Sequence, residues 1–269
     1  MLATLTGPHW FDPDTVASET SWAAALLAAG AAIEAAETAA FALVRPPGHH
    51  ARPGTAMGFC LVNNVAVAAR HMQVEHSVER VAIVDYDLHH GNGTQEIFWD
   101  DDTVLFVSLH SWPFYPGTGG PTEQRETTVN APLSAGSGDE EYLLAFDEVV
   151  VPAVQRFGPD LLLVSAGFDA HEEDPFGEMR VTVDGFRELS KRSAALAPRV
   201  AAVLEGGYNI ETLPRLVIAA LEGFSESTTA GCGTAVESVR HWSFVLHVPL
   251  RPGSDVSELT QVSAATPLE

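Results

Sequence analysis

The chain has 269 residues, with 36 acidic against 14 basic side chains and a net charge of −22. Such a surface repels phosphate backbones and attracts cationic ligands, so we expect no direct binding of nucleic acid. Hydrophobic residues make up 46% of the chain, as in globular proteins, and neither a membrane-spanning run nor a signal-peptide pattern is present, so we expect a cytoplasmic protein with no membrane partner.

Helical and strand-like patterns alternate along the chain, which predicts an α/β fold with an open, mostly parallel sheet and helices on both faces. In chain order the pattern predicts a helix at 21–37, a strand at 40–44, a helix at 61–73, strands at 81–85 and 104–108, a helix at 139–157 capped by Ser137 or Asp139, a strand at 161–165, a helix at 183–196, a strand at 200–204 and a helix at 211–224. We expect one domain over residues 1–269, with an atypical tail at 225–269 in which "HWSFVLHVPL" resembles a strand.

Four of these strands run into polar segments, "RPPGHH" (45–50), "DYDLHHGNG" (85–93), "SAGFDAHEEDP" (165–175) and "EGGY" (205–208). Ligands of open α/β sheets bind beyond the carboxyl ends of the strands. Charged groups at the end of a buried strand are costly unless they are paired or bound to a metal. The four segments together therefore predict a functional site at this edge.

Asp87, His89 and Asp169 are the best candidates for metal ligands in these segments. Two carboxylates and one imidazole leave a fourth position open, as catalytic zinc requires. The spacing of Asp87 and His89 puts both side chains on one side of an extended segment, and Asp85 shares that side in an orienting role. A salt-bridged loop without a metal is the alternative.

Proton transfer and oxyanion stabilisation have candidates in the other two segments. His49 and His50 follow a turn fixed by prolines and a glycine, and one or both could move a proton from an activated water to a leaving amine. Tyr208 follows two glycines and can donate its hydroxyl to a developing oxyanion, although a lone tyrosine more often only packs.

The motifs "RPPGHHA", "GFCLVNN", "DYDLHHGNGTQEIF", "YPGTG", "SAGFDAHEEDP" and "LEGGY" resemble the zinc-dependent histone deacetylase family, especially its bacterial, class II-like branch. The resemblance runs from about Asp14 to Leu221 and implies the arginase/deacetylase fold. It also implies a Zn²⁺ ion held by Asp87, His89 and Asp169. His49 would pair with Asp85, His50 would pair with Asn92, and Tyr208 would polarise the substrate carbonyl.

A narrow substrate channel is implied by the same resemblance. Gly58, Phe59 and Tyr115 would line it, with Tyr115 in a place where phenylalanine is usual. Phe176 would lie at the rim, where class II-like members often have leucine. Asp14 resembles the acid that holds the substrate backbone.

Structural K⁺ or Na⁺ sites are a further implication of the family pattern. One would use Asp85, Asp87, His89, Ser108 and Leu109, partly through backbone carbonyls, and a second would fall around Phe98, Asp101 and Val104.

Family members usually begin with a further strand, helix and loop ahead of the Asp14 region, which this sequence lacks. Because an uncovered strand edge invites pairing, we expect a homo-oligomer, or closure of the edge by the tail.

The leading functional hypothesis is a zinc-dependent amidohydrolase that removes acetyl or short acyl groups from lysine side chains or similar cationic amines. Acetylated polyamines are an alternative substrate class. A truncated, non-catalytic binding or regulatory member is a second hypothesis, and a two-manganese ureohydrolase fits the "HHGNG" loop and the tyrosine less well. Salt adaptation or a GC-rich genome explains the acidic composition equally well, so charge does not identify the substrate.

Overall fold

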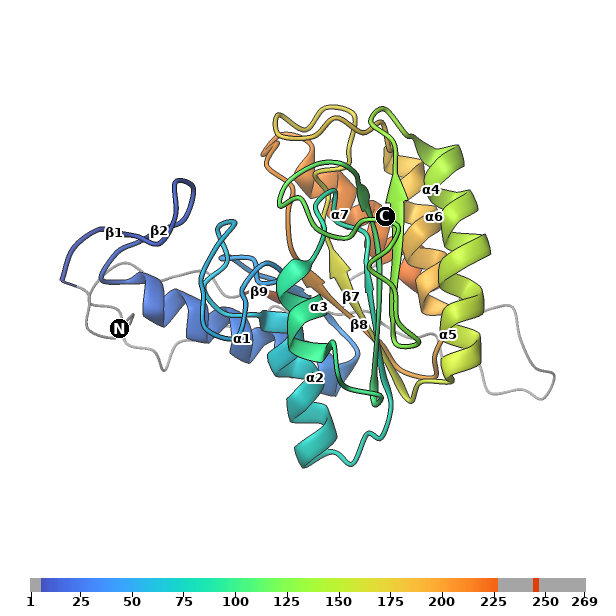
Figure 1. Cartoon of the computed structure of the whole chain (residues 1–269), viewed down its shortest axis with the longest axis horizontal. Coiled ribbons are helices and arrows are strands. Elements are labelled where there is room, and N and C mark those ends of the chain that lie inside the picture. The colour runs from blue at the N-terminus through green and yellow to red at the C-terminus, as the bar shows by residue number, and fades with distance from the viewer. Residues whose placement is uncertain (1–5, 227–243, 247–269) are drawn as a thin grey trace, which may run out of the picture.

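The computed structural model describes residues 6–226 and 244–246 and shows one parallel sheet with helices on both faces (Figure 1). The sheet has seven strands in the order β6-β5-β4-β7-β8-β3-β9. Their bounds are β3 Phe41–Leu43, β4 Val81–Asp85, β5 Val104–Ser111, β6 Thr128–Leu133, β7 Leu161–Ala166, β8 Val200–Leu204 and β9 Phe244–Leu246. Every neighbouring pair is parallel. The central strands are buried along their whole length, which explains their continuous apolar sequences.

Two apolar layers fill the spaces between the sheet and the helices. The helices themselves lie on both faces of the sheet (Figure 1). On one face lie α1 (Ser21–Thr38), α2 (Asn64–Glu75) and the short α3 (Asn92–Phe98), with a buried surface on α1 made of alanines. On the other face lie α4 (Asp139–Ala145), α5 (Val151–Phe157), α6 (Val183–Ala194) and α7 (Leu213–Glu226). Within residues 6–226, no helix is both long and apolar enough to cross a membrane.

The predicted helix at 139–157 is one continuous helical segment with the predicted bounds, a different N-cap and an irregular middle. A π-helical turn at Phe146–Val150 joins α4 to α5. The N-cap is Gly138, whose N–H donates to the Glu141 carboxylate (2.8 Å), so the prediction of Ser137 or Asp139 as cap is wrong. Asp139 instead accepts from the backbone N–H (2.8 Å) and the hydroxyl of Thr182. A carboxylate that caps a neighbouring segment is not available for its own helix.

Three strands lie outside the sequence prediction. β6 has mixed polarity and contains Pro132, which an edge strand tolerates because one side needs no hydrogen-bond donor. β1 (His9–Trp10) and β2 (Val16–Ala17) form a short antiparallel hairpin ahead of α1. Strands of two residues carry too little pattern to be predicted.

Part of the tail, at Phe244–Leu246, pairs in parallel with β3 at one edge of the sheet. The remainder of the strand-like "HWSFVLHVPL" and of the tail lies outside the described residues. Self-association of the chain stays a prediction.

α6 and α7 pack closely because Gly223 has no side chain. A Cβ at Gly223 would overlap the backbone oxygen of Arg187 in α6. At Gly30, in α1, a Cβ would meet nothing within 4 Å. The two glycines therefore form a matched pair of helical positions.

We expect Gly223→Ala to lower the free energy of unfolding by about 1–3 kcal/mol, because the methyl group forces the helices apart. Gly30→Ala should raise it by about 0.5–1 kcal/mol, because alanine loses less backbone entropy on folding. Urea denaturation of both variants measures the difference. Equal stabilities would show that α6 and α7 separate at no cost.

Candidate active site

The polar segments after β3, β4, β7 and β8 meet at one edge of the sheet. These four strands are neighbours in the order β4-β7-β8-β3 and all are parallel, so their carboxyl ends lie side by side. The site is therefore assembled from parts of the chain that are up to 162 residues apart, as between Arg45 and Gly207.

Asp87, His89 and Asp169 bring one ligand atom each to within 4.8 Å of one another. His89 Nδ1 lies 3.2 Å from Asp87 Oδ1 and 3.1 Å from Asp169 Oδ2. Both carboxylates are fully buried. Asp87 Oδ2 accepts from the Gly206 N–H (2.7 Å) and Asp169 Oδ1 from the Leu88 N–H (2.9 Å), so the backbone fixes their orientation.

The electrostatics of this cluster favour a bound cation. Burial, together with the charge of Asp87, raises the pKa of Asp169 to about 6. Burial alone would lower the pKa of His89, but hydrogen bonds to Asp169 and Asp87 override it and raise the pKa to about 10. Asp87 and Asp169 thus stabilise positive charge on His89. Two carboxylates and one imidazole in this arrangement fit Zn²⁺ and leave one coordination position open.

Glycines surround the ligands because the backbone passes too close for a side chain. A Cβ at Gly206 would overlap Asp169 Oδ2, and a Cβ at Gly167 would overlap Asp87 Oδ2. In the loop after β4, a Cβ at Gly91 would overlap Asp85 Oδ2. These glycines let three loops close around the carboxylates.

Two buried histidines lie beside the cluster, one paired with a carboxylate and the other with an amide. His49 Nδ1 is 3.0 Å from Asp85 Oδ2, and His50 Nδ1 is 2.8 Å from Asn92 Oδ1. Burial lowers the pKa of His49, but the charges of Asp87 and Asp85 raise it well above its usual value. Burial and the positive charges of His49 and His89 hold the pKa of His50 well below its usual value. The His49 imidazole therefore favours its cationic form, and the His50 imidazole favours its neutral form.

Tyr208 is held in the same site by its backbone. Its N–H donates to Asp174 Oδ2 (2.7 Å). Burial and the charges of Asp169 and Asp87 raise the pKa of the Tyr208 phenol, so its hydroxyl stays a hydrogen-bond donor.

Aromatic rings form the approach to the cluster. Phe59 packs 5.7 Å from Tyr208, and Phe176 packs 5.1 Å from Tyr208, measured between ring centroids. The Tyr115 ring lies 5.2 Å from the His50 ring. Phe59, Tyr115 and Phe176 are also exposed, at 40%, 37% and 56%, so these rings reach from the buried site to solvent.

Gly58 lets the His50 and Tyr115 rings lie close to the backbone of the loop that carries Phe59; these aromatic residues form the wall of the approach. The φ of Gly58 is +54°, and a Cβ would overlap the His50 ring and lie 3.0 Å from the Tyr115 hydroxyl. Only glycine fits at this position without strain.

Carboxylates lie near the outer end of the aromatic wall, on the β1–β2 turn. The Phe59 N–H donates to Thr15 Oγ1 (3.0 Å), which ties the turn to the wall. Asp14 is exposed, and its N–H donates to Asp12 Oδ1 (2.9 Å). Burial raises the pKa of Tyr115 to about 12, and the charges of Asp12 and Asp14 add to the effect, so both carboxylates lie within electrostatic range of the tyrosine.

Comparison with known proteins identifies the family of the chain. The family described as "Histone deacetylase domain" matches residues 3–224. The chain belongs to this family. A "Probable deacetylase" of Archaeoglobus fulgidus is 46% identical over 224 residues, which is 76% of this chain and 62% of that protein. "Histone deacetylase 10, chloroplastic" of Oryza sativa is 44% identical over 232 residues, 78% of this chain and 52% of that protein.

Among solved structures, the crystal structure of the HDA15 HD domain superimposes with a TM-score of 0.78 at 42% identity. It covers 84% of this chain and 68% of that chain. The prediction of the arginase/deacetylase fold is confirmed, and so is the resemblance to the histone deacetylase family. The chain spans less than two thirds of the lengths of the two curated deacetylases.

Within this site, Glu205 and Arg45 escaped the sequence analysis. Glu205 is fully buried, and its Oε2 accepts from the N–H groups of Gly48 (2.6 Å) and His49 (3.1 Å). Arg45 donates to the carbonyl oxygens of Glu205 and of Gly207, the latter at 2.8 Å. They tie the loop that carries the histidines to the loop that carries Tyr208. Both residues lie inside the motifs "RPPGHH" and "EGGY". The signal that could have pointed to them is a charged residue at the end of a buried strand.

Asp174 is another residue that the sequence analysis did not single out. Besides the Tyr208 N–H, its carboxylate accepts from the N–H of Phe176 (3.0 Å), so one side chain fixes both aromatic residues.

The residues expected at the first monovalent cation site are close together but already engaged. Asp85 Oδ1 accepts from the Asp87 N–H (3.1 Å), and Asp85 is registered with Ser108 across β4 and β5. The Ser108 hydroxyl pairs with His110 Nδ1 (2.9 Å), and Leu109 follows it in β5.

At the second expected cation site, the Asp101 N–H donates to the Phe98 carbonyl (3.0 Å) and the Val104 N–H to the Asp101 carbonyl (3.4 Å). The Asp101 carboxylate pairs with Arg70 and Thr103. K⁺ or Na⁺ binding at either place stays a prediction.

Proposed function

We propose that this protein is a zinc-dependent amidohydrolase that removes acetyl or short acyl groups from lysine side chains or similar cationic amines. The observation that carries the proposal is the Asp87–His89–Asp169 cluster, which lies at the inner end of an aromatic passage beside two histidines of unequal charge. Membership of the deacetylase family supports hydrolysis of an amide.

Asp87, His89 and Asp169 would hold the zinc ion. When bound, zinc supplies Lewis acidity that polarises an amide carbonyl and makes water a better nucleophile at neutral pH. Asp87 and Asp169 are fully buried, and the low polarity of such surroundings strengthens these electrostatic effects.

His50 is the proton carrier of the proposed reaction. Its Nδ1 donates to Asn92 Oδ1, so Nε2 keeps a lone pair that can accept a proton from the attacking water. The water oxygen bonds to the acyl carbon, the C–N bond breaks, and His50 returns the proton to the departing amine. A carboxylic acid and an amine are the products.

His49 and Tyr208 stabilise the charge that develops during this step. Asp85 keeps His49 in its cationic form beside Asp87. The Tyr208 hydroxyl donates a hydrogen bond to the carbonyl oxygen as that oxygen becomes negative.

The passage fits the uncharged aliphatic stem of an acylated amine, with the amide at the inner end. Phe59 and Tyr115 offer apolar faces to the stem, and Asp12 and Asp14 offer negative charge near its outer end. Small acetylated polyamines remain an alternative class, because the same carboxylates would attract a second amine of a small substrate.

The proposal is tested by incubating the purified chain with acetyl-lysine peptides and with acetylated polyamines, with and without added zinc. We expect hydrolysis that a chelator abolishes and zinc restores. Asp169→Ala should lose both the activity and the tightly held zinc, because it removes a ligand. Full zinc retention at the cluster by Asp169→Ala, or no turnover of either class by loaded wild type, contradicts the proposal; the second result favours a non-catalytic member.

Tyr208→Phe should reduce kcat by about 10²–10³-fold, because a single oxyanion donor is lost. Zinc content and unfolding temperature should stay those of the wild type, since the ring and the Asp174 contact remain. Wild-type turnover would assign oxyanion stabilisation to another group.

Asn92→Asp should shift the acidic limb of the kcat/KM pH profile to higher pH. A carboxylate beside His50 stabilises the imidazolium and raises its pKa, so the base becomes protonated at a higher pH. Asn92→Ala removes the orienting contact without adding charge and should lower kcat/KM with no upward shift of that limb. If Asn92→Asp leaves the limb in place, His50 is not the base.

A further inference from the structure

A second group of metal-binding side chains lies at the end of the molecule opposite the active site. Glu37 is in the last turn of α1, His71 is in α2, and His76 follows α2 directly. The segment after His76 leads into the amino end of β4, whereas Asp87 and His89 follow its carboxyl end. The two groups are therefore separated by the length of the strand.

The three side chains converge on one point. His71 Nε2 and His76 Nε2 each lie 2.8 Å from the same oxygen, Glu37 Oε1. The two imidazole rings are 5.4 Å apart with an interplanar angle of 52°. All three ligand atoms lie within 4.8 Å of one another.

As Nε2–H tautomers, His71 and His76 both donate to the same Glu37 oxygen, and these hydrogen bonds lower the pKa of Glu37. A divalent cation at the point of convergence would take the place of the two Nε2 protons, with both Nε2 lone pairs and the carboxylate oxygen as its ligands.

We propose that Glu37, His71 and His76 form a second site for a divalent transition metal ion, of which Zn²⁺ is the best match. Two imidazole nitrogens and one carboxylate oxygen are typical zinc donors, with metal–ligand distances of about 2.0–2.2 Å. Bound zinc needs the nitrogens only a few tenths of an ångström farther from the oxygen than they are. The exposed Glu37 side chain can make this adjustment.

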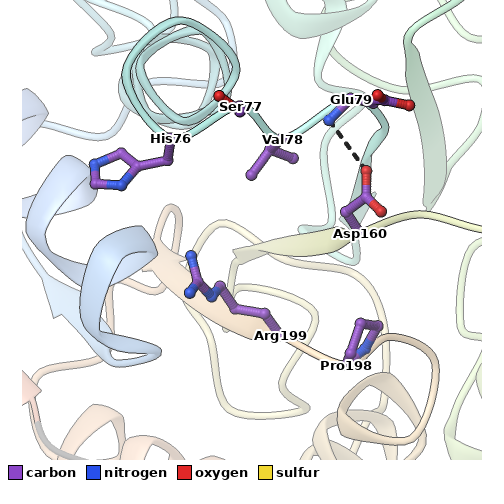
Figure 2. A pocket seen from close by; sticks show the side chains of 7 residues that line it. All are labelled: His76, Ser77, Val78, Glu79, Asp160, Pro198 and Arg199. Carbon is purple, nitrogen blue, oxygen red and sulfur yellow. Dashed lines mark hydrogen bonds between the residues drawn. The ribbon is translucent and has the colours of Figure 1, made fainter.

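Water can reach the remaining coordination positions. His76 borders an open pocket of about 570 Å³ that Ser77, Val78, Glu79, Asp160, Pro198 and Arg199 also line (Figure 2). In Figure 2 Arg199 comes from the wall facing His76. No lysine or arginine pairs with Glu37 among the ion pairs of the described residues, so the metal would not have to displace one.

Metal at this site would join the end of α1 to the end of α2. Both helices cover the same face of the sheet, where small residues such as Ala32 and Ala69 form their shared layer. An ion that binds only the folded chain stabilises it in proportion to its concentration. The site thus couples zinc to stability and leaves the catalytic cluster untouched.

Another group, the buried His171 with the exposed Glu172 and Glu173, has its ligand atoms equally close but is a weaker candidate. His171 Nδ1 already accepts from the Glu173 N–H (3.2 Å), and the Glu173 carboxylate pairs with Arg215. It serves as an internal comparison.

The test is calorimetric titration of Zn²⁺ into the full chain whose catalytic cluster is already loaded. We expect one further Zn²⁺ to bind to wild type, more weakly as the pH falls because protons compete for the histidines. Glu37→Gln and His71→Ala should each weaken it at least ten-fold. Glu34→Gln, one turn earlier in α1, changes the charge equally and should leave it unchanged.

Thermal unfolding gives the second readout. Added Zn²⁺ should raise the Tm of wild type and Glu34→Gln but not of Glu37→Gln or His71→Ala, while all four keep the same activity at low zinc. The absence of a further Zn²⁺ below 1 mM would overturn the proposal and leave an ion-pair cluster. Retention of the site in both Glu37→Gln and His71→Ala would overturn it as well, and would point to the His171 group.

Discussion

The buried charge of Asp87 and Asp169 is the constraint on which the rest of this structure depends. Two carboxylates beside one imidazole at the end of a buried sheet are costly unless a cation and backbone donors compensate them. The N–H groups of Gly206 and Leu88 supply part of this compensation. The glycines at 167 and 206 follow from the same need, because side chains there would occupy the space of the carboxylates.

Two charged residues, Glu205 and Arg45, hold the loops of the site in register. Glu205 follows β8 and binds the backbone that follows β3, while Arg45 follows β3 and binds the backbone that follows β8. The two residues form a reciprocal bridge between adjacent strand ends. Displacement of either loop would leave buried polar groups without partners, which costs more than the hydrogen bonds themselves contribute. The histidines and Tyr208 therefore keep a fixed relation.

The two ends of the sheet have different chemistry for a topological reason. Parallel strands gather all their carboxyl ends on one side, where the loops after β3, β4, β7 and β8 form a buried cluster. The returning helices α1 and α2 end on the other side and carry the exposed Glu37–His71–His76 group. Asp87 and Asp169 of the inner cluster are fully buried, whereas Glu37 and His76 of the outer group are exposed.

The sequence by itself determined the parallel sheet and the family, because continuous apolar strands ending in acidic and histidine-rich loops are local patterns. It did not reveal β6 or the hairpin of β1 and β2, whose short or mixed sequences lack such a pattern. Nor did it reveal the role of Glu205, since that depends on β8 lying beside β3. The meeting of Glu37 with His71 and His76 likewise arises only when α1 and α2 pack side by side. Contacts between distant segments follow from strand order and helix packing, and no local sequence pattern encodes them.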